Sequence, residues 1–181
     1  MFTVRLSKRE CTDKEKIERF LEQAQVGYLG MAAGGMPYVV PMNYAWLNGA
    51  IYVHGAEEGK RAHCLRENDQ VCFAISEHYG TLTSPVPAHT DTAYMSVVMY
   101  GTASFLTDWD EATAAMQRML DKYVPGFYEQ PLARGHVEKY RSSLGGKTAI
   151  IKIVPSEMTA KENAPAEDRL FRPGVKLCQQ A

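Results

Sequence analysis

The stretch from Tyr38 to Arg61, YVVPMNYAWLNGAIYVHGAEEGKR, contains two strand patterns, a tight turn and a pair of cations. Tyr38 to Trp46 is rich in β-branched and aromatic residues, which is typical of a strand. Asn48-Gly49 is a strong two-residue turn signal, and Ala50 to His54 reads as the strand that follows it. The stretch therefore predicts antiparallel strands joined by short connections.

The end of this stretch has the features of an anion site. Two glycines lead from the strand to Lys60 and Arg61, and a short helix is predicted from about Gly59 to Asn68. A helix N-terminus offers unpaired N–H groups and partial positive charge, to which two cationic side chains add. The pattern predicts a phosphate-binding loop. A solvated basic helix start is the alternative interpretation of the same residues.

The rest of the chain alternates between helical and strand patterns. Thr12 and Glu15 have capping-box spacing ahead of an amphipathic helix, and Asp108 and Glu111 repeat that spacing ahead of a second one. The predicted helices cover residues 12–25 and 109–123, and the predicted strands lie within 26–107 and at 147–154. Residues 78–93 read as a loop between strands at 71–76 and 94–107, with Gly101 a bulge or bend. Residues 125–146 read as irregular, with a short helix near 136–143.

Strands joined mainly by short turns favour a mainly β fold with peripheral helices, a small antiparallel β-barrel or sandwich. We expect one domain, residues 1–160, followed by a polar tail, residues 161–181. The sequence has neither a G-x-G-x-x-G pattern nor a Walker-type loop, so dinucleotide-binding and P-loop folds are not supported.

Composition, charge and residue spacing argue against several classes of protein function. The 181 residues carry 20 Lys and Arg against 21 Asp and Glu, and a net charge of -1 argues against a nucleic-acid partner. No apolar run approaches the ~20 residues needed to cross a bilayer, and the first 13 residues are too charged for a signal peptide. The four cysteines are widely spread, which favours cytoplasmic thiols over disulfides. The histidines have no spacing that predicts a metal site.

A series of short motifs resembles the FMN-binding split-barrel proteins, the wider family of pyridoxamine 5'-phosphate oxidase, and within it most closely the nitroimidazole-resistance-type proteins. In chain order the motifs are Pro37 to Tyr44, Asn48-Gly49, Tyr52 to Ala56, Gly59-Lys60-Arg61, Val71-Cys72-Phe73 and Tyr94 to Gly101. The resemblance covers residues 27–107 well, and the order of elements extends it to about Val154.

The resemblance implies a six-stranded antiparallel split barrel that forms a homodimer and holds FMN at the subunit interface. Gly59, Lys60 and Arg61 would bind the flavin phosphate. A hydroxyl from Ser96, with Val97 beside it, would come from the other subunit. The strand along the isoalloxazine ring would offer the backbone of Val40, Pro41, Met42, Asn43 and Tyr44.

His54 is the candidate catalytic residue, since it lies between the strand that would face the ring and the phosphate loop; a structural hydrogen-bonding role is the alternative. The implied reaction is two-electron reduction of a small electron-poor organic substrate, such as a nitroimidazole. A haem- or flavin-binding protein without robust turnover is the rival reading. Pyridoxamine 5'-phosphate oxidase activity is doubtful, because the C-terminal region has Arg169 and Arg172 but no Arg-x-His arrangement.

Overall fold

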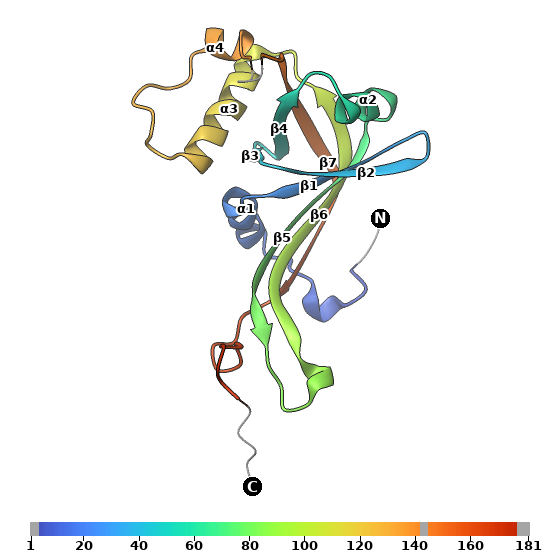
Figure 1. Cartoon of the computed structure of the whole chain (residues 1–181), viewed down its shortest axis with the longest axis vertical. Coiled ribbons are helices and arrows are strands. Elements are labelled where there is room, and N and C mark those ends of the chain that lie inside the picture. The colour runs from blue at the N-terminus through green and yellow to red at the C-terminus, as the bar shows by residue number, and fades with distance from the viewer. Residues whose placement is uncertain (1–3, 142–144, 177–181) are drawn as a thin grey trace.

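The structure, a computed structural model, describes residues 4–141 and 145–176. Within these residues one antiparallel sheet carries the helices at its periphery (Figure 1). The strands are β1 (Gly27–Ala33), β2 (Met36–Met42), β3 (Ala45–Leu47), β4 (Ala50–Ala56), β5 (Gln70–Leu82), β6 (Asp91–Phe105) and β7 (Thr148–Asn163). The α-helices are α1 (Lys14–Gln23), α2 (Lys60–Glu67), α3 (Trp109–Tyr123) and α4 (Arg134–Glu138), and two 3-10 turns are η1 (Ser7–Arg9) and η2 (Pro87–His89).

The sheet has seven strands, in the order β2-β1-β5-β6-β7-β4-β3, where six were predicted. The difference arises because the predicted strand at residues 38–46 is two strands. β2 and β3 are consecutive in the chain but lie at opposite edges of the sheet, linked by Asn43 and Tyr44. The Tyr44 side chain is fully buried, and its hydroxyl donates to the Leu21 carbonyl at 2.8 Å. This buried contact fixes the point at which the chain crosses from one edge to the other, which is where the barrel is split.

The main core fills the concave side of the sheet. Along β6 the odd-numbered residues from Ala93 to Met99 are buried, while the even-numbered ones are partly or fully exposed on the outer face, as a two-residue period requires. Helix α1 adds Ile17, Phe20 and Leu21 to this core, which confirms its predicted amphipathic pattern. The Tyr44 and Phe73 rings meet edge to face, with centroids 5.5 Å apart.

Helix α3 covers a second, smaller apolar cluster on the outer face of β3 and β4. Ala115 and Met119 of the helix are buried there with Tyr52 of β4. Glu111, in the first turn of α3, accepts from the Tyr52 hydroxyl at 2.6 Å and pairs with Lys152 at 2.6 Å. The Lys152 ammonium, with the Tyr52 hydroxyl as a second donor, lowers the pKa of Glu111, so the carboxylate ties α3 to two neighbouring strands.

The loop predicted over residues 78–93 is shorter in the structure, where residues 83–90 connect β5 to β6 and include η2. β5 continues to Leu82 and β6 begins at Asp91, and together they form a long two-stranded arm that extends away from the helices (Figure 1). The register shifts between His78 and Gly80. A segment distant in the chain pairs with the end of this arm. Leu170 forms an isolated antiparallel β-bridge with Leu82, and the Thr83 N–H donates to the Arg169 carbonyl at 2.8 Å. These partners are about 90 residues away, so local patterning could not reveal them.

The final strand is also longer than predicted, because β7 runs through Pro155 to Asn163. Gly101 of β6 lies opposite Pro155, where the register shifts, which confirms the predicted bulge. A Cβ added at Gly101 would collide with the Val154 backbone carbonyl. Because Gly101 has no side chain, β6 and β7 can approach closely here. The pairing therefore continues past Pro155, although proline has no N–H to donate to it.

The sequence predicted the N-cap residue of α3 but not that of α1. Asp108 caps α3 by accepting from the N–H groups of Asp110 and Glu111 at 2.9 and 3.3 Å, as expected. At α1 the predicted Thr12 cap was wrong: Asp13 is the cap, and its carboxylate accepts from the Lys16 N–H at 3.1 Å. α4 covers residues 134–138, slightly earlier than the predicted short helix.

None of the helices formed by the described residues is long and apolar enough to cross a membrane. Three cysteines in the described ranges, Cys11, Cys64 and Cys72, are free thiols, and Cys178 lies outside those ranges.

Candidate functional site

Among the described residues, β2 is an edge strand that pairs with β1 alone, so the backbone groups on its outer side have no strand partner there. Val40 and Met42 are half-buried against the core, whereas Pro41 and the following Asn43 are exposed. Such an edge offers N–H and C=O groups at a fixed spacing beside apolar side chains. It could hold a flat heteroaromatic ring that needs both hydrogen bonds and apolar contact.

Arg61 lies against β4 rather than extending into solvent. Its guanidinium occupies the space over Gly55 that any larger side chain would fill. Nη2 donates to the Ala56 carbonyl at 3.0 Å, and Nη1 lies 3.7 Å from the Met42 sulfur. Nε is buried and has no hydrogen-bond partner among the described residues. Burial lowers the pKa of Arg61, which is the cost of holding a cation without a paired anion. A bound anion would remove that cost.

The N-terminus of α2 lies beside this guanidinium. Gly59 precedes the helix as its N-cap residue, with φ 101°, and has no side chain to cap it, so the first N–H groups of α2 are left for another acceptor. Lys60 is exposed, and its ammonium lies 4.5 Å from the centroid of the Tyr38 ring on β2. Residues 59–61 therefore gather helix N–H groups and two cations next to the β2 edge, an arrangement that fits a phosphate attached to a ring.

His54 faces helix α3. Its Nδ1 lies 3.1 Å from the Met119 sulfur, and its side chain is half-buried. Burial, and secondly the positive charge of Arg61, lower the pKa of His54, so the imidazole is neutral at pH 7. A neutral imidazole can donate or accept one proton, and Arg61 is close enough to influence its charge. Its contact with Met119 also has a simple packing role.

Tyr44 and Val97 differ from the other predicted contact residues. The Tyr44 N–H donates to the Tyr123 hydroxyl at 3.0 Å, and the Tyr44 carbonyl lies 3.2 Å from the same oxygen. Since its ring is also in the core, Tyr44 links α3 to the sheet and presents no side-chain atom to a ligand. The Val97 side chain is fully buried in the main core and points away from the face that carries Ser96.

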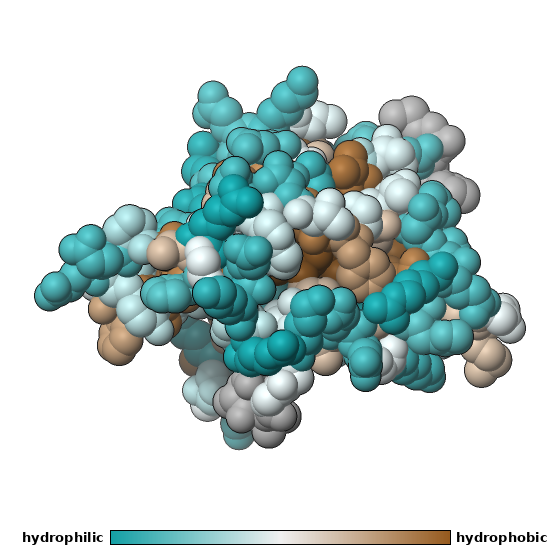
Figure 2. All heavy atoms as spheres, turned by 90° about the horizontal axis from the view of Figure 1, so that it is seen from above, coloured by the Kyte–Doolittle hydropathy of each residue, from teal (hydrophilic) through white to brown (hydrophobic). Residues whose placement is uncertain are grey.

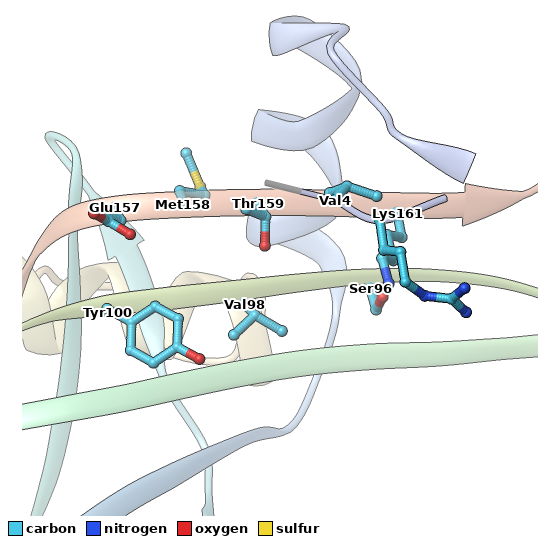
Figure 3. Close-up of a pocket in the computed structure, with 9 residues that line it drawn as sticks. Val4, Ser96, Val98, Tyr100, Glu157, Met158, Thr159 and Lys161 are labelled. Atoms are coloured by element: carbon cyan, nitrogen blue, oxygen red, sulfur yellow. The ribbon is translucent and has the colours of Figure 1, made fainter. Parts of the chain in front are cut away.

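Ser96 lies in a separate shallow pocket of about 390 Å³ on the outer face of β6 and β7. Figure 3 shows Ser96, Val98 and Tyr100 projecting from β6, with Thr159 and Lys161 on β7 beside them. Arg5 also lines this pocket. The serine predicted from the resemblance thus shares its pocket with two cations, Arg5 and Lys161, that the sequence analysis did not select.

Ser96 and the residues at 59–61 are not brought together within one chain. The guanidinium of Arg66, in the last turn of α2, lies 5.2 Å from the Phe105 ring at the far end of β6. Ser96 is nine positions along β6 from Phe105, which is about 30 Å at ~3.3 Å per residue. A ligand at Arg61 can therefore meet a Ser96 hydroxyl only if that serine belongs to a second copy of the chain.

Comparison with known proteins agrees with this fold. The family model described as pyridoxamine 5'-phosphate oxidase matches residues 13–162, so the chain belongs to this family. No curated protein sequence matches the chain.

Among solved structures, one similar protein is a candidate 5-nitroimidazole antibiotic resistance protein from Bacteroides thetaiotaomicron, with 25% identity and a TM-score of 0.67 over 84% of this chain and 85% of that one. The flavocytochrome Anf3 from Azotobacter vinelandii is 19% identical, with a TM-score of 0.74 over 96% and 85% of the two chains. The FAD and haem binding protein from Mycobacterium smegmatis is 14% identical, with a TM-score of 0.72 over 96% and 93%. The last two likenesses show the fold. The predicted split barrel and family are confirmed.

Proposed function

We propose that this protein is an FMN-dependent oxidoreductase that reduces a small electron-poor organic molecule, with nitroimidazoles as the nearest example of the substrate class. The observation that carries the proposal is the position of Arg61. Its guanidinium covers Gly55, its buried Nε has no hydrogen-bond partner among the described residues, and the N-terminus of its helix has no side-chain cap. The similar nitroimidazole-resistance structure supports the choice of substrate class.

In this proposal the chain's own residues bind and orient the cofactor. Lys60, Arg61 and the first N–H groups of α2 hold its phosphate, and the β2 edge from Val40 to Asn43 holds its ring by backbone hydrogen bonds. FMN, when bound, supplies the two-electron redox chemistry. His54 stays neutral at pH 7 and is placed to pass a proton to or from a substrate oxygen or nitrogen.

We also propose that the working form is a homodimer in the cytoplasm. The outer face of β6 and β7 leaves Val154, Met158 and Tyr100 exposed by 49%, 41% and 43%. An apolar strand face of this kind is a typical interface. A two-fold contact here would let Ser96 of each chain approach the flavin of the other, which one chain alone cannot do. The three free cysteines fit a reducing compartment.

The test combines a spectrum with a reaction. The purified protein should show flavin absorption, and its chemically reduced form should be reoxidised by a 5-nitroimidazole under anaerobic stopped-flow conditions. His54→Gln should keep the bound flavin but slow the reoxidation. A protein that binds FMN yet is reoxidised by the nitroimidazole no faster than free FMN would contradict the enzymatic part of the proposal.

A haem-binding role is the second candidate. Two structural neighbours are a flavocytochrome and a FAD and haem binding protein, and His136 of this chain lines a cavity in which a ligand could reach its imidazole. A Soret band in the purified protein that disappears in His136→Ala would favour haem. A flavin spectrum without a Soret band would favour the reductase.

A further inference from the structure

A second cavity, of about 470 Å³, lies under the connection between α3 and α4, on the outer side of β7. We call it the α3–α4 cavity. Its apolar wall is formed by Met116 and Leu120 of α3, Val137 of α4 and Ile150 of β7, and the ring residues Tyr128 and Tyr140 also line it. Figure 2, which views the end of the molecule that carries α2, α3 and α4, shows groups of apolar side chains among mostly hydrophilic ones. A volume of this size is ordinary for a small-molecule site.

The described lining of the cavity consists of apolar and uncharged polar residues together with His136. None of the described residues that line it is Asp, Glu, Lys or Arg. Tyr128 and Tyr140 are 59% and 44% exposed, so two rings face water that a ligand would displace. The methionine sulfur adds a polarisable surface that suits an aromatic partner. These features favour an uncharged, largely aromatic occupant over an anion or a metal ion.

Hydrogen-bonding groups are available at the same site. Gln130, His136 and Thr148 line the cavity, and their side chains make no hydrogen bond to a described residue. The hydroxyls of Tyr128 and Tyr140 likewise make no hydrogen bond to a described residue. A ligand with one or two polar substituents could therefore bind without displacing an internal hydrogen bond. This is the composition expected of a site that combines an apolar enclosure with a few orienting polar groups.

The cavity is next to the candidate catalytic histidine. Ile150, which lines the cavity, is directly opposite His54 in the β4–β7 pairing, so their Cβ atoms are about 4.5–5.5 Å apart. Met119, which contacts His54, lies between Met116 and Leu120 on α3. An occupant of the cavity is therefore separated from His54 by one side chain.

We propose that the α3–α4 cavity binds a small, uncharged aromatic molecule bearing a hydrogen-bonding substituent. The cavity would hold the substrate of the proposed reductase beside His54, and this assignment of the substrate site rests on the proposed function. Binding in the cavity itself requires neither FMN nor turnover.

The experiment measures binding by calorimetry without any reductant, so that no turnover occurs. The probes are 4-nitroaniline, which is neutral, and 4-nitrobenzoate, which has the same nitro-substituted ring and a negative charge. The protein should bind 4-nitroaniline at least tenfold more tightly than 4-nitrobenzoate, because none of the described lining residues is Lys or Arg. Met116→Trp should fill the cavity and weaken 4-nitroaniline binding at least tenfold. Ala114→Trp, on the exposed side of the same helix, is the matched control and should leave binding unchanged.

Several outcomes would overturn the proposal: no binding of 4-nitroaniline, equal binding of the two probes, or equal binding by wild type and Met116→Trp. If Met116→Trp does not fold, Tyr140→Ala decides, since that side chain is partly exposed; its affinity should fall at least threefold, and an unchanged affinity would refute the site. A Soret band that depends on His136 would assign the cavity to haem instead.

The Lys60→Ala, Arg61→Ala double variant separates this proposal from the proposed function. It should lose FMN affinity and keep 4-nitroaniline binding. Retained FMN affinity in that variant would count against the phosphate site alone, whereas failure of the probe experiments would count against the cavity alone.

Discussion

Removal of both cations at the start of α2 should sharply weaken FMN binding. Hydrogen bonds to charged groups contribute about 1.5–3 kcal/mol each. If Lys60 and Arg61 each give one such bond to the phosphate, the double alanine variant loses about 3–6 kcal/mol, which is at least about a hundredfold in affinity. Arg61 should account for most of the loss, because its guanidinium is half-buried with an unpaired Nε, whereas Lys60 is exposed and screened by solvent.

The assay is a titration of apoprotein with FMN and with riboflavin, which has the same ring but no phosphate. Riboflavin affinity should change little in the double variant. Lys14→Ala, Arg19→Ala is the control, since it removes the same charge from exposed positions of α1. Equal losses for FMN and riboflavin would refute the reasoning, because the cations would then support the fold rather than bind phosphate. An unchanged FMN affinity would place the phosphate elsewhere.

Four further predictions concern substitutions at single positions. Gly55→Ala should displace the Arg61 guanidinium, which is the flexible end of a side chain, and so lower FMN affinity while the melting temperature changes little. Asp108→Ala should lower the free energy of unfolding by about 0.5–2 kcal/mol in urea denaturation, because α3 loses its N-cap. The lowered pKa of His54 means that the unfolded chain binds more protons below pH ~6.5, so stability should fall as the pH drops through and below that value, and the fall should be shallower in His54→Gln. Val98→Arg, on the outer face of β6, should give a light-scattering mass of one 20.2 kDa chain, where the wild type gives twice that mass; a dimeric variant would move the interface elsewhere.

The local signals in the sequence were good guides wherever the deciding contacts are also local. The amphipathic period of residues 109–123 predicted the bounds of α3, and the capping-box spacing predicted its Asp108 cap. The Asn48-Gly49 turn joins β3 and β4 as predicted, with both residues at positive φ. Turn chemistry and helical period depend on neighbours within a few residues, so they can be read along the chain.

The candidate site was only partly readable in this way. A strand, a glycine and two cations predicted an anion-binding helix start, and α2 begins at Lys60. The sequence could not show that the Arg61 guanidinium folds back over Gly55, since both its contacts there and the buried state of Nε depend on how α2 packs against the sheet. Nor could it show that Met119 meets His54, 65 residues away.

The sequence by itself determined the family, the mainly β class and the positions of most elements, because strand patterning, turn residues and helix caps are local. The tertiary structure alone decided which strands lie at the edges, how far β5 and β7 extend, and which predicted residues share a surface. Tyr44 and Val97 look like binding-strand residues in sequence, but pairing and burial turn their side chains into the core. The physical reason is that register and packing depend on partners distant in the chain, and shifting a strand by one residue exchanges its buried and exposed faces.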